Sequence, residues 1–471
     1  MLTYAFSDLN NIPLYEKLYN YIKEDILIGR LKPEYKLPSK RSFAKNLGIS
    51  VITVENAYDQ LMAEGYIYSL PKKGFYVATL PENNFSEGEA LPQAPAKINK
   101  VDEYTWDFSS NKVIQEQFPF SIWAKILREC LRDYQEKLLD TSPQAGSYEL
   151  RLAIAKHLRD FRGMQISPEQ IIIGAGTEYL YGQLVQLLGH DKIYGVEDPG
   201  YKKMAQVYAA SGAKVQHISF TKDGLNILEL EKFQVDVAHT SPSHQFPTGY
   251  ITPITKRYEL LSWAQAKASR YIIEDDFDSE FRMAGKPIPT LQSIDSIEKV
   301  IYMNTFTKSI APNLRISYMV LPPHLTKIYH EKLNFYSCPV TSMIQLALAR
   351  FINEGYFEKH INRMRNFYRK ERDELLALIK NSEAAKYVNI SEEDAGLHLL
   401  LNLNIPCTDE EFQARLKAKK LRLPSLSQYY HQPQTKSSHN FILNYSSLSE
   451  KNLAEAVTLL CEEIIKINAE C

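Results

Sequence analysis

Residues 301–318 read IYMNTFTKSIAPNLRISY and contain the pattern that decides the fold. The stretch begins inside a short apolar run, VIYM at 300–303, which predicts a buried strand. A polar segment from Asn304 to Thr307 follows this run and leads to Lys308. A lysine amine at the end of a strand can project into a cleft and attack the carbonyl carbon of a ligand. Lys308 is therefore the first candidate for covalent chemistry.

Short apolar runs on both sides of this segment alternate with stretches long enough to form helices. Separations of a few tens of residues leave room for helical crossovers, which connect parallel strands. The sequence therefore predicts a mostly parallel sheet covered by helices on both faces. The strand candidates are 170–173, 192–196, 235–239, 271–273, 300–303 and 316–321.

Residues after about 340 depart from this alternation. A long helical pattern covers 341–380, polar sequence with few strand signals follows, and an amphipathic helix is expected at 450–468. We therefore expect a smaller C-terminal subdomain.

The first eighty residues have a pattern of their own, in which helices come first and a hairpin comes last. Apolar residues at helical spacing predict a helix that Gly29 ends. Ser39 and Ser50 are placed to cap two further helices, and short strands are expected at 66–68 and 75–77. Three helices followed by a hairpin predict a winged helix-turn-helix.

Length and composition limit the class of protein. With 471 residues, of which 44% are hydrophobic, the chain is long enough to form two or three cores. No stretch approaches the roughly 18–20 consecutive apolar residues of a membrane span, and the first residues lack the features of a signal peptide. The five cysteines share no CxxC spacing, which argues against disulfides and against a metal site. We therefore expect a cytoplasmic protein without a bound metal.

Residues 82–100 have the polar, proline-containing and aperiodic composition of a linker. We therefore predict a first domain at 1–79, a linker at 80–105 and a second domain at 106–471. The net charge of −1 gives no hint of a partner, but residues 1–79 hold ten lysines and arginines against eight acidic residues.

The segment 13–77, with LPSKRSF at 37–43 and ISVITVENAYDQL at 49–61, resembles the GntR-type winged helix-turn-helix almost position by position. The resemblance implies that this domain binds double-stranded operator DNA, with exposed amides at a helix start and basic side chains on the phosphates. The residues that it assigns to the DNA are Ser39, Lys40, Arg41, Ser50, Val51, Thr53, Asn56, Lys72 and Lys73.

One position departs from the GntR pattern. Most of the family has arginine after the first serine of the third helix, where this chain has Val51. Base recognition must then come from other side chains, or from contact between Val51 and a thymine methyl group. The alternative is a winged helix used only for contacts with protein.

From about residue 106 to the end, the chain resembles the fold-type I aminotransferases. Together with the GntR-like head, it is similar to the MocR family of bacterial regulators. The resemblance implies a multidomain α/β protein, with a winged helix-turn-helix and a fold-type I aminotransferase-like domain that binds pyridoxal 5'-phosphate (PLP). It also implies a homodimer.

The resemblance assigns the cofactor contacts residue by residue. Lys308 is the lysine that forms a Schiff base with the cofactor aldehyde, and Asp275, in YIIEDDFDSEF, is the carboxylate for the pyridine nitrogen. Tyr201 is the aromatic residue that packs on the ring. The residues that it places at the phosphate are Gly176, Thr177, Thr305, Thr307 and Arg315.

Several positions differ from ordinary aminotransferases. Phe246 stands where many of them have the asparagine that contacts the ring hydroxyl, and Phe277 where a tyrosine is common. The arginines that bind a ligand carboxylate in relatives that respond to γ-aminobutyrate correspond to Lys203 and Gln428, and FILNYSSL also lacks the usual arginine. Because these arginines form paired, charge-assisted hydrogen bonds, a small amino acid is a poor candidate effector.

Three functions fit these observations. The first is a PdxR-like transcription factor that senses PLP itself and controls vitamin B6 synthesis. The second is a GabR-like regulator that responds to an amino acid or amine at the cofactor, and the third is a true aminotransferase. The missing arginines favour the first over the second, and the DNA-binding head disfavours the third. We therefore expect a regulator without assigned catalytic residues rather than an enzyme.

Overall fold

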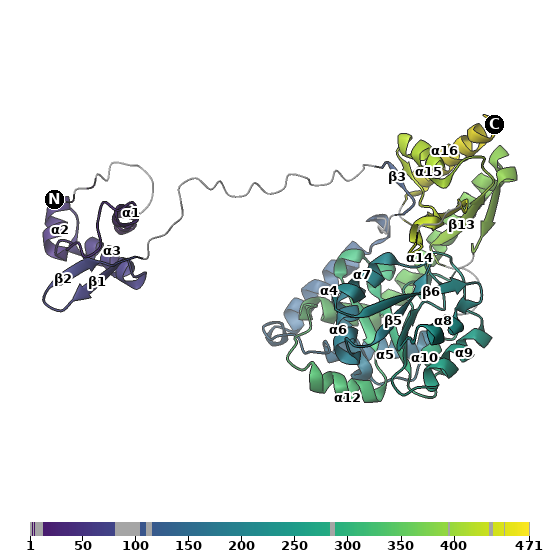
Figure 1. The fold of residues 1–471 in the computed structure, drawn as a ribbon, viewed down its shortest axis with the longest axis horizontal. Coiled ribbons are helices and arrows are strands. Elements are labelled where there is room, and N and C mark those ends of the chain that lie inside the picture. Colours follow the sequence, from purple (N-terminus) through teal and green to yellow (C-terminus); the bar gives the residue numbers. More distant parts are fainter. Residues whose placement is uncertain are drawn as a thin grey trace. The chain divides into compact units, whose positions relative to one another are not determined.

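The computed structural model describes Leu2, Tyr4 and residues 13–80, 104–109, 115–282, 288–393, 396–432, 437–446 and 448–470. The chain divides into an N-terminal unit, Met1–Val101, and a C-terminal unit, Asp102–Cys471 (Figure 1). The predicted linker at 80–105 lies mostly outside the described residues.

The N-terminal unit has three helices followed by a two-stranded antiparallel hairpin, as the sequence predicts. Ser39 and Ser50 each cap the helix that follows, because their hydroxyl groups accept hydrogen bonds from the backbone amides of Ser42 and Thr53. The winged helix-turn-helix prediction is therefore confirmed. The elements are α1 (Leu14–Leu27), α2 (Lys40–Leu47), α3 (Val51–Ala63), β1 (Ile67–Leu70) and β2 (Gly74–Val77).

Helix α3 shows why this unit is stable with so small a core. Its inward face buries Val54, Ala57, Tyr58 and Leu61, the residues at helical spacing. The Tyr58 hydroxyl donates a hydrogen bond to the Pro38 carbonyl just before α2. The core therefore fixes α2 and α3 against each other and leaves the opposite face of α3 exposed.

The C-terminal unit is built on an eight-stranded sheet of order β4-β11-β10-β9-β8-β5-β6-β7. The central strands from β10 to β6 pair in parallel, whereas β11 is antiparallel to both of its neighbours. The predicted mostly parallel sheet is therefore confirmed. Its strands are β4 (Ile171–Gly174), β5 (Ile193–Asp198), β6 (Lys214–Thr221), β7 (Gly224–Leu225), β8 (Val237–Thr240), β9 (Tyr271–Asp275), β10 (Val300–Thr305) and β11 (Ser317–Val320).

Helices cover both faces of this sheet, because successive residues of a strand point to opposite sides. In β4, Ile171 and Ile173 belong to the cluster that contains Leu150 of α5, whereas Ile172 packs with Leu180 of α6. The helices around the sheet are α4 (Phe120–Asp133), α5 (Tyr148–Arg162), α6 (Thr177–Leu188), α7 (Lys202–Ala210), α8 (Ile227–Lys232), α9 (Ile254–Gln265), α10 (Leu291–Ile294), α11 (Phe306–Ser309), α12 (Pro323–Lys332), α13 (Ser342–Asn353) and α14 (Tyr356–Lys380).

The C-terminal subdomain corrects one expectation. The sequence between the long helices was expected to be poor in strands, but it contains a three-stranded antiparallel sheet, and another strand pairs in parallel with β3 near the start of the unit. The short apolar run in β13 does not distinguish a strand from a buried helix by periodicity. The elements are β3 (Trp106–Asp107), β12 (Val388–Ser391), β13 (His398–Leu403), α15 (Asp409–Ala418), β14 (Leu421–Arg422), β15 (Asn440–Asn444) and α16 (Glu450–Ala469).

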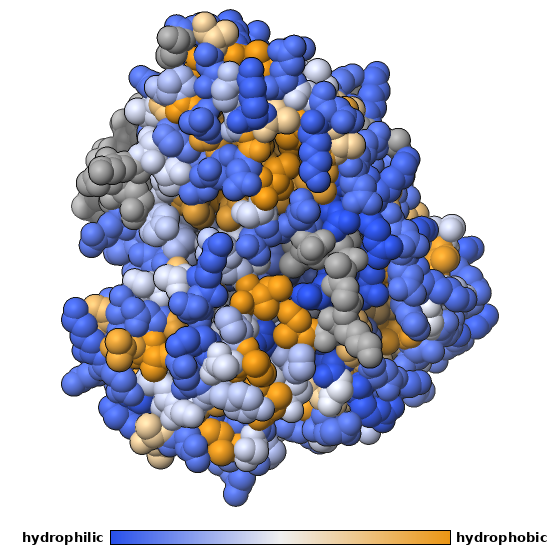
Figure 2. Space-filling model, turned by 90° about the vertical axis from the view of Figure 1, so that its right-hand side faces the viewer, coloured by the Kyte–Doolittle hydropathy of each residue, from blue (hydrophilic) through white to orange (hydrophobic). Residues whose placement is uncertain are grey.

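The surface of one side of the molecule is mostly hydrophilic, with hydrophobic side chains gathered in separate patches (Figure 2). Among the described residues, no helix is both long enough and apolar enough to cross a membrane.

Candidate ligand site and candidate nucleic-acid interface

A cavity of about 200 Å³ lies in the C-terminal unit where β9 and β10 end. Seven of the eight residues assigned to a cofactor line it, and the eighth, Gly176, precedes Thr177 at the start of α6. The structure thus brings together side chains that are more than one hundred residues apart in the chain. The lining residues are Thr177, Glu178, Tyr181, Glu197, Tyr201, Met204, Ser241, Phe246, Asp275, Phe277, Asp278, Thr305, Thr307, Lys308, Arg315, Leu397, His398 and Asn444.

Lys308 lies in the short helix α11, directly after the buried strand β10. Removal from water lowers the pKa of its amine to about 8, while the nearby Asp278 acts in the opposite direction. Next to it, the Ser309 carbonyl accepts a hydrogen bond from the Nε2 atom of His360, in α14. Lys308 therefore has a substantial neutral fraction near neutral pH, in the form that can attack a carbonyl.

Asp275 is the last residue of β9, and only one of its two carboxylate oxygens is occupied. Tyr181 donates a hydrogen bond to Oδ2 at 2.9 Å, and the Nε2 atom of His239 lies 3.5 Å from the same oxygen. The other oxygen, Oδ1, is buried and has no hydrogen-bond partner among the described residues. A buried carboxylate oxygen without a partner suits a ligand that brings an N–H donor.

The end of the cavity at the start of α6 is formed by backbone amides, hydroxyl groups and Arg315. Gly176 caps α6 with a positive φ of 94°, and a Cβ atom there would lie 2.3 Å from Nη2 of Arg315. The Oγ1 atoms of Thr305 and Thr307 are 2.7 Å apart, and the Ser317 hydroxyl donates to Thr305. A helix start with an arginine and hydroxyl donors is a typical environment for a phosphate group.

These three features can be compared with the groups of PLP. The neutral amine of Lys308 suits an aldehyde, the unpartnered oxygen of Asp275 suits a protonated pyridine nitrogen, and the amide and hydroxyl cluster with Arg315 suits a phosphate. The residues that are present therefore fit this cofactor. Tyr201, which is 44% exposed, lines the same cavity and meets the Phe246 ring edge to face.

Residues that sequence reasoning missed stabilise the site. The hydroxyl of Tyr181 and the imidazole of His239 hold Asp275, and Glu197 accepts hydrogen bonds from Thr240 and from the Ser241 amide. None of these residues lies in a recognisable short motif, so only the fold reveals them. Burial raises the pKa of Glu197 to about 7 despite its hydrogen bonds.

The two positions that replace carboxylate-binding arginines do not reach this cavity. Lys203 forms an exposed ion pair with Glu178, 2.6 Å from Nζ to Oε1, and the Gln428 side chain donates to Gln413. Among the described residues that line the cavity, Arg315 is the only arginine, and it lies beside the phosphate-type end. Among the described lining residues, no guanidinium group is therefore available at the His398 end of the cavity to bind a ligand carboxylate.

The candidate nucleic-acid interface is the exposed face of α2 and α3 with the hairpin tip. Ser39, Arg41, Ser50, Val51 and Asn56 are exposed there, and Thr53, whose amide donates to the capping Ser50 hydroxyl, is partly buried. Lys72 and Lys73 lie exposed in the turn between β1 and β2. The assigned residues therefore share one region, although their contact with DNA stays a prediction.

Lys40, which the resemblance also assigns to the DNA, is paired within the N-terminal unit. Its Nζ atom lies 2.9 Å from Glu55 and 3.2 Å from Asp59, both on α3, so the amine joins α2 to α3. Contact between Lys40 and a phosphate stays a prediction. Arg41, the basic residue next to Lys40, is exposed.

Comparison with known proteins follows the same division. Residues 14–77 match the family described as bacterial regulatory proteins, gntR family, and residues 106–460 match aminotransferase class I and II. The HTH-type transcriptional regulator YdeL of Bacillus subtilis is 39% identical over 96% of both chains. The probable rhizopine catabolism regulatory protein MocR of Rhizobium meliloti is 31% identical, over 96% of this chain and 93% of the relative. The chain belongs to the MocR family of transcriptional regulators.

Two further proteins, one regulator and one aminotransferase, are similar to this MocR-family chain. The HTH-type pyridoxine biosynthesis transcriptional regulator PdxR of Corynebacterium glutamicum is 27% identical over 93% of both chains. A multiple substrate aminotransferase from Thermococcus profundus has the same fold over 79% of this chain and 94% of its own, with a TM-score of 0.67 and 23% identity. The predicted family and fold class are thus confirmed.

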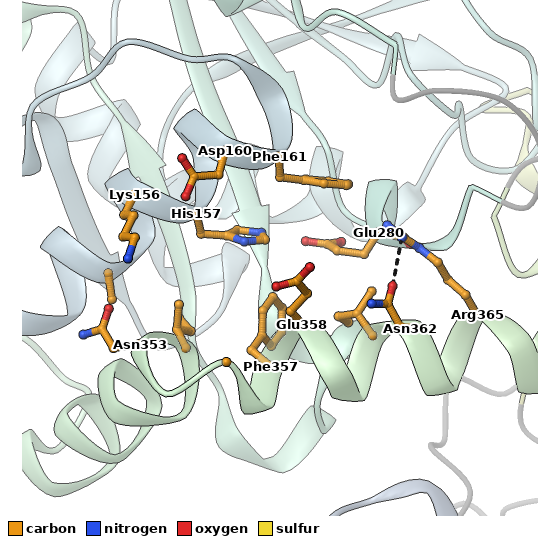
Figure 3. A pocket seen from close by; sticks show the side chains of 14 residues that line it. Lys156, His157, Asp160, Phe161, Glu280, Asn353, Phe357, Glu358, Asn362 and Arg365 are labelled. Atoms are coloured by element: carbon orange, nitrogen blue, oxygen red, sulfur yellow. Dashed lines mark hydrogen bonds between the residues drawn. The ribbon is translucent and has the colours of Figure 1, made fainter.

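The MocR-family chain also has a second cavity, of about 340 Å³, between α5 and the start of α14 (Figure 3). His157 and Glu280 face each other across it, and Arg365 donates a hydrogen bond to Asn362 on its rim. Burial lowers the pKa of His157 to about 4 and raises the pKa of Glu280 to about 7. His157 is therefore largely uncharged near neutral pH, whereas Glu280 titrates close to neutral pH.

Proposed function

We propose that this MocR-family protein is a transcription factor that binds operator DNA through its N-terminal unit and senses PLP in its C-terminal unit, in control of vitamin B6 synthesis genes. The observation that carries the proposal is the buried Oδ1 atom of Asp275, which has no hydrogen-bond partner among the described residues and lies in the same cavity as Lys308. A buried acceptor of this kind is stabilised when a ligand supplies the missing donor.

PLP, when bound, supplies an aldehyde and an electron-withdrawing ring. The residues of this chain then have separate tasks. Lys308 would hold the aldehyde carbon, Asp275 would keep a proton on the ring nitrogen, and Arg315 with the start of α6 would hold the phosphate. Tyr181 keeps Asp275 in place through its hydrogen bond.

The absence of carboxylate-binding arginines supports PLP as the effector over an amino acid. A charge-assisted hydrogen bond contributes about 1.5–3 kcal/mol, so the loss of a two-pronged contact weakens carboxylate binding by several orders of magnitude. Lys203 pairs with Glu178 and does not itself line the cavity, so among the described lining residues no second guanidinium group compensates for this loss. The same deficit argues against efficient transamination of ordinary amino acids.

A regulator that responds to an amine is the second candidate. It is favoured by His398 and Asp278, which line the cavity and offer hydrogen-bond acceptors. An amine ligand would be accommodated there, whereas an amino acid would not.

A homodimer is part of the proposal. Large apolar side chains are exposed near the end of α4 and after α12, among them Leu131, Leu139 and Phe335. Leu131 borders a depression that is also lined by Ser337 and Cys338, so the end of α4 lies close to the segment after α12. Exposed apolar groups of this kind are typical of a surface that a second subunit covers.

Operator titration tests the function directly. An operator is selected from random DNA with the full chain, and its affinity is measured for cofactor-free protein, with PLP, and with amino acids added to each. We expect PLP alone to change the affinity at least about tenfold, which corresponds to a coupling free energy of about 1.4 kcal/mol. An amino acid that acts while PLP does not would contradict the proposal. Steady conversion of an amino acid to its keto acid would indicate an enzyme.

Arg41→Ala should weaken operator binding about tenfold and make the salt dependence shallower by about one charge, because one phosphate contact is lost. The measurement is fluorescence anisotropy at several salt concentrations. Lys32→Ala is the matched control, since Lys32 is an exposed cation outside α2, α3 and the hairpin. Equal behaviour of the two variants would remove Arg41 from the interface.

A further inference from the structure

Three side chains form a compact group at the end of the cavity away from Arg315. His244, in the loop after β8, places its Nδ1 atom 2.8 Å from Oδ2 of Asp278, and the rings of His244 and His398 are 4.6 Å apart. Each of the three residues is at most 5% exposed. Asp278 and His398 line the cavity beside Lys308, whereas His244 lies behind them.

The hydrogen bonds of His398 define which of its nitrogen atoms faces the ligand. The ring bonds to the backbone of Pro247, and because proline has no N–H, the ring must donate to its carbonyl. The Nε2 atom is buried without a partner among the described residues, so Nδ1 makes this bond. Burial, followed by the proximity of His244 and Lys308, lowers the pKa of His398 well below its usual value. His398 is therefore a neutral ring that presents an unused lone pair.

Asp278 gives this end of the cavity its charge. Its carboxylate bonds to His244 and lies near Lys308, whose amine is mostly neutral when the pH exceeds about 8. The arginine that lines the cavity lies at its other end, beside Gly176. The local surface thus offers acceptors and negative charge, which attract donors and repel carboxylates.

We propose that Asp278 and the Nε2 atom of His398 form a subsite for the donor group of an amine ligand, that is, a diamine or an amino alcohol. His244 is a positioning residue, since it holds Asp278 through a hydrogen bond. The inference rests on the proposed function in one respect, which is that the ligand lies beside the group that Lys308 binds. The subsite narrows the alternative effector, an amino acid or an amine, to one chemical class, the diamines and amino alcohols.

Four ligands with the same four-carbon chain test the subsite: 1,4-diaminobutane, 4-aminobutan-1-ol, 1-aminobutane and 4-aminobutanoate. Calorimetric titration of the full chain gives the affinity for each, with and without PLP. We expect the first two to bind at least about tenfold more tightly than 1-aminobutane, and 4-aminobutanoate to bind most weakly. All samples contain a chelator, because a metal ion on the same three side chains would compete.

His398→Phe keeps an aromatic ring in place but removes the acceptor. The preference for 4-aminobutan-1-ol over 1-aminobutane should then fall to within about twofold. Asp278→Asn should reduce the affinity for 1,4-diaminobutane about tenfold more than the affinity for the amino alcohol. His217→Phe is the control, because His217 stacks on His431 at 3.7 Å and does not line this cavity.

The outcomes separate the two proposals. Absorbance of bound PLP is recorded in the same samples, so loss of PLP binding counts against the proposed function alone. Equal affinity for all four ligands, tighter binding of 4-aminobutanoate, or an unchanged preference in both His398→Phe and Asp278→Asn overturns the subsite. In PLP-free protein the comparison is made above pH 8, where the Lys308 amine is mostly neutral and the subsite consists of the chain's own side chains.

Discussion

Lys308→Ala should abolish stable retention of PLP. We expect the wild-type chain to keep the cofactor through gel filtration because a covalent bond would add to the contacts of Asp275 and Arg315, whereas the variant would have only those contacts. Borohydride reduction followed by intact mass measurement shows the difference, since the mass of reduced PLP should appear on the wild-type protein and be absent from the variant. The PLP effect on operator affinity should disappear with it.

Lys203→Ala is the matched control for this experiment. Lys203 is exposed, pairs with Glu178 and does not line the cavity, so its removal should leave PLP retention unchanged. Because the pKa of Lys308 is lowered to about 8, the neutral fraction of its amine rises with pH. Capture of PLP should therefore accelerate from pH 6 to about pH 8 and level off above it. A variant that lacks Lys308 but still changes operator affinity with PLP would show that covalent capture is not the signal.

Arg162→Met should strongly destabilise the C-terminal unit. Arg162, near the end of α5, and Asp276 form an ion pair whose side chains are 2% and 1% exposed, and the Tyr302 hydroxyl also donates to Asp276. Removal of one partner from a buried pair leaves an uncompensated charge, which lowers the free energy of unfolding by about 3–5 kcal/mol. Denaturant unfolding followed by tryptophan fluorescence measures the change. Since Asp276 follows Asp275 directly, PLP affinity should fall as well.

Arg159→Met gives the matched control, three residues earlier on the same helix. Arg159 pairs with Asp160, but both side chains are more than half exposed. Exposed pairs contribute about 0–1 kcal/mol, so this variant should unfold almost like the wild type. If Arg162→Met were no less stable than Arg159→Met, the buried pair of Arg162 and Asp276 would not stabilise the end of β9, where Asp275 lies.

The sequence predicted the fold best where a residue type has few structural roles. Capping serines, apolar residues at helical spacing and the run from β10 to Arg315 predicted the winged helix-turn-helix and the mostly parallel sheet, and the structure confirms both. The resemblance to the MocR family is likewise confirmed by the relatives. The residues assigned to the cofactor meet in one cavity, but their role there stays a prediction.

The sequence was least informative where a side chain acts through a distant partner. Lys40 is paired with Glu55 and Asp59 of the next helix, and no local pattern announces such a pair. No motif pointed to His398, and strand β13 was missed with it. Its unused nitrogen is defined only by Pro247, more than one hundred residues earlier in the chain. Tertiary contacts of this kind cannot be read from spacing.

The hydrogen bond between His360 and the Ser309 carbonyl attaches α14 to the segment that carries Lys308. This helix has 25 residues and is therefore about 37 Å long, and it begins beside Lys308 and packs at later turns against α16 of the C-terminal subdomain. The helix therefore connects the segment that carries Lys308 with the C-terminal subdomain, so that the wall of the cavity and the periphery of the C-terminal unit share one continuous element.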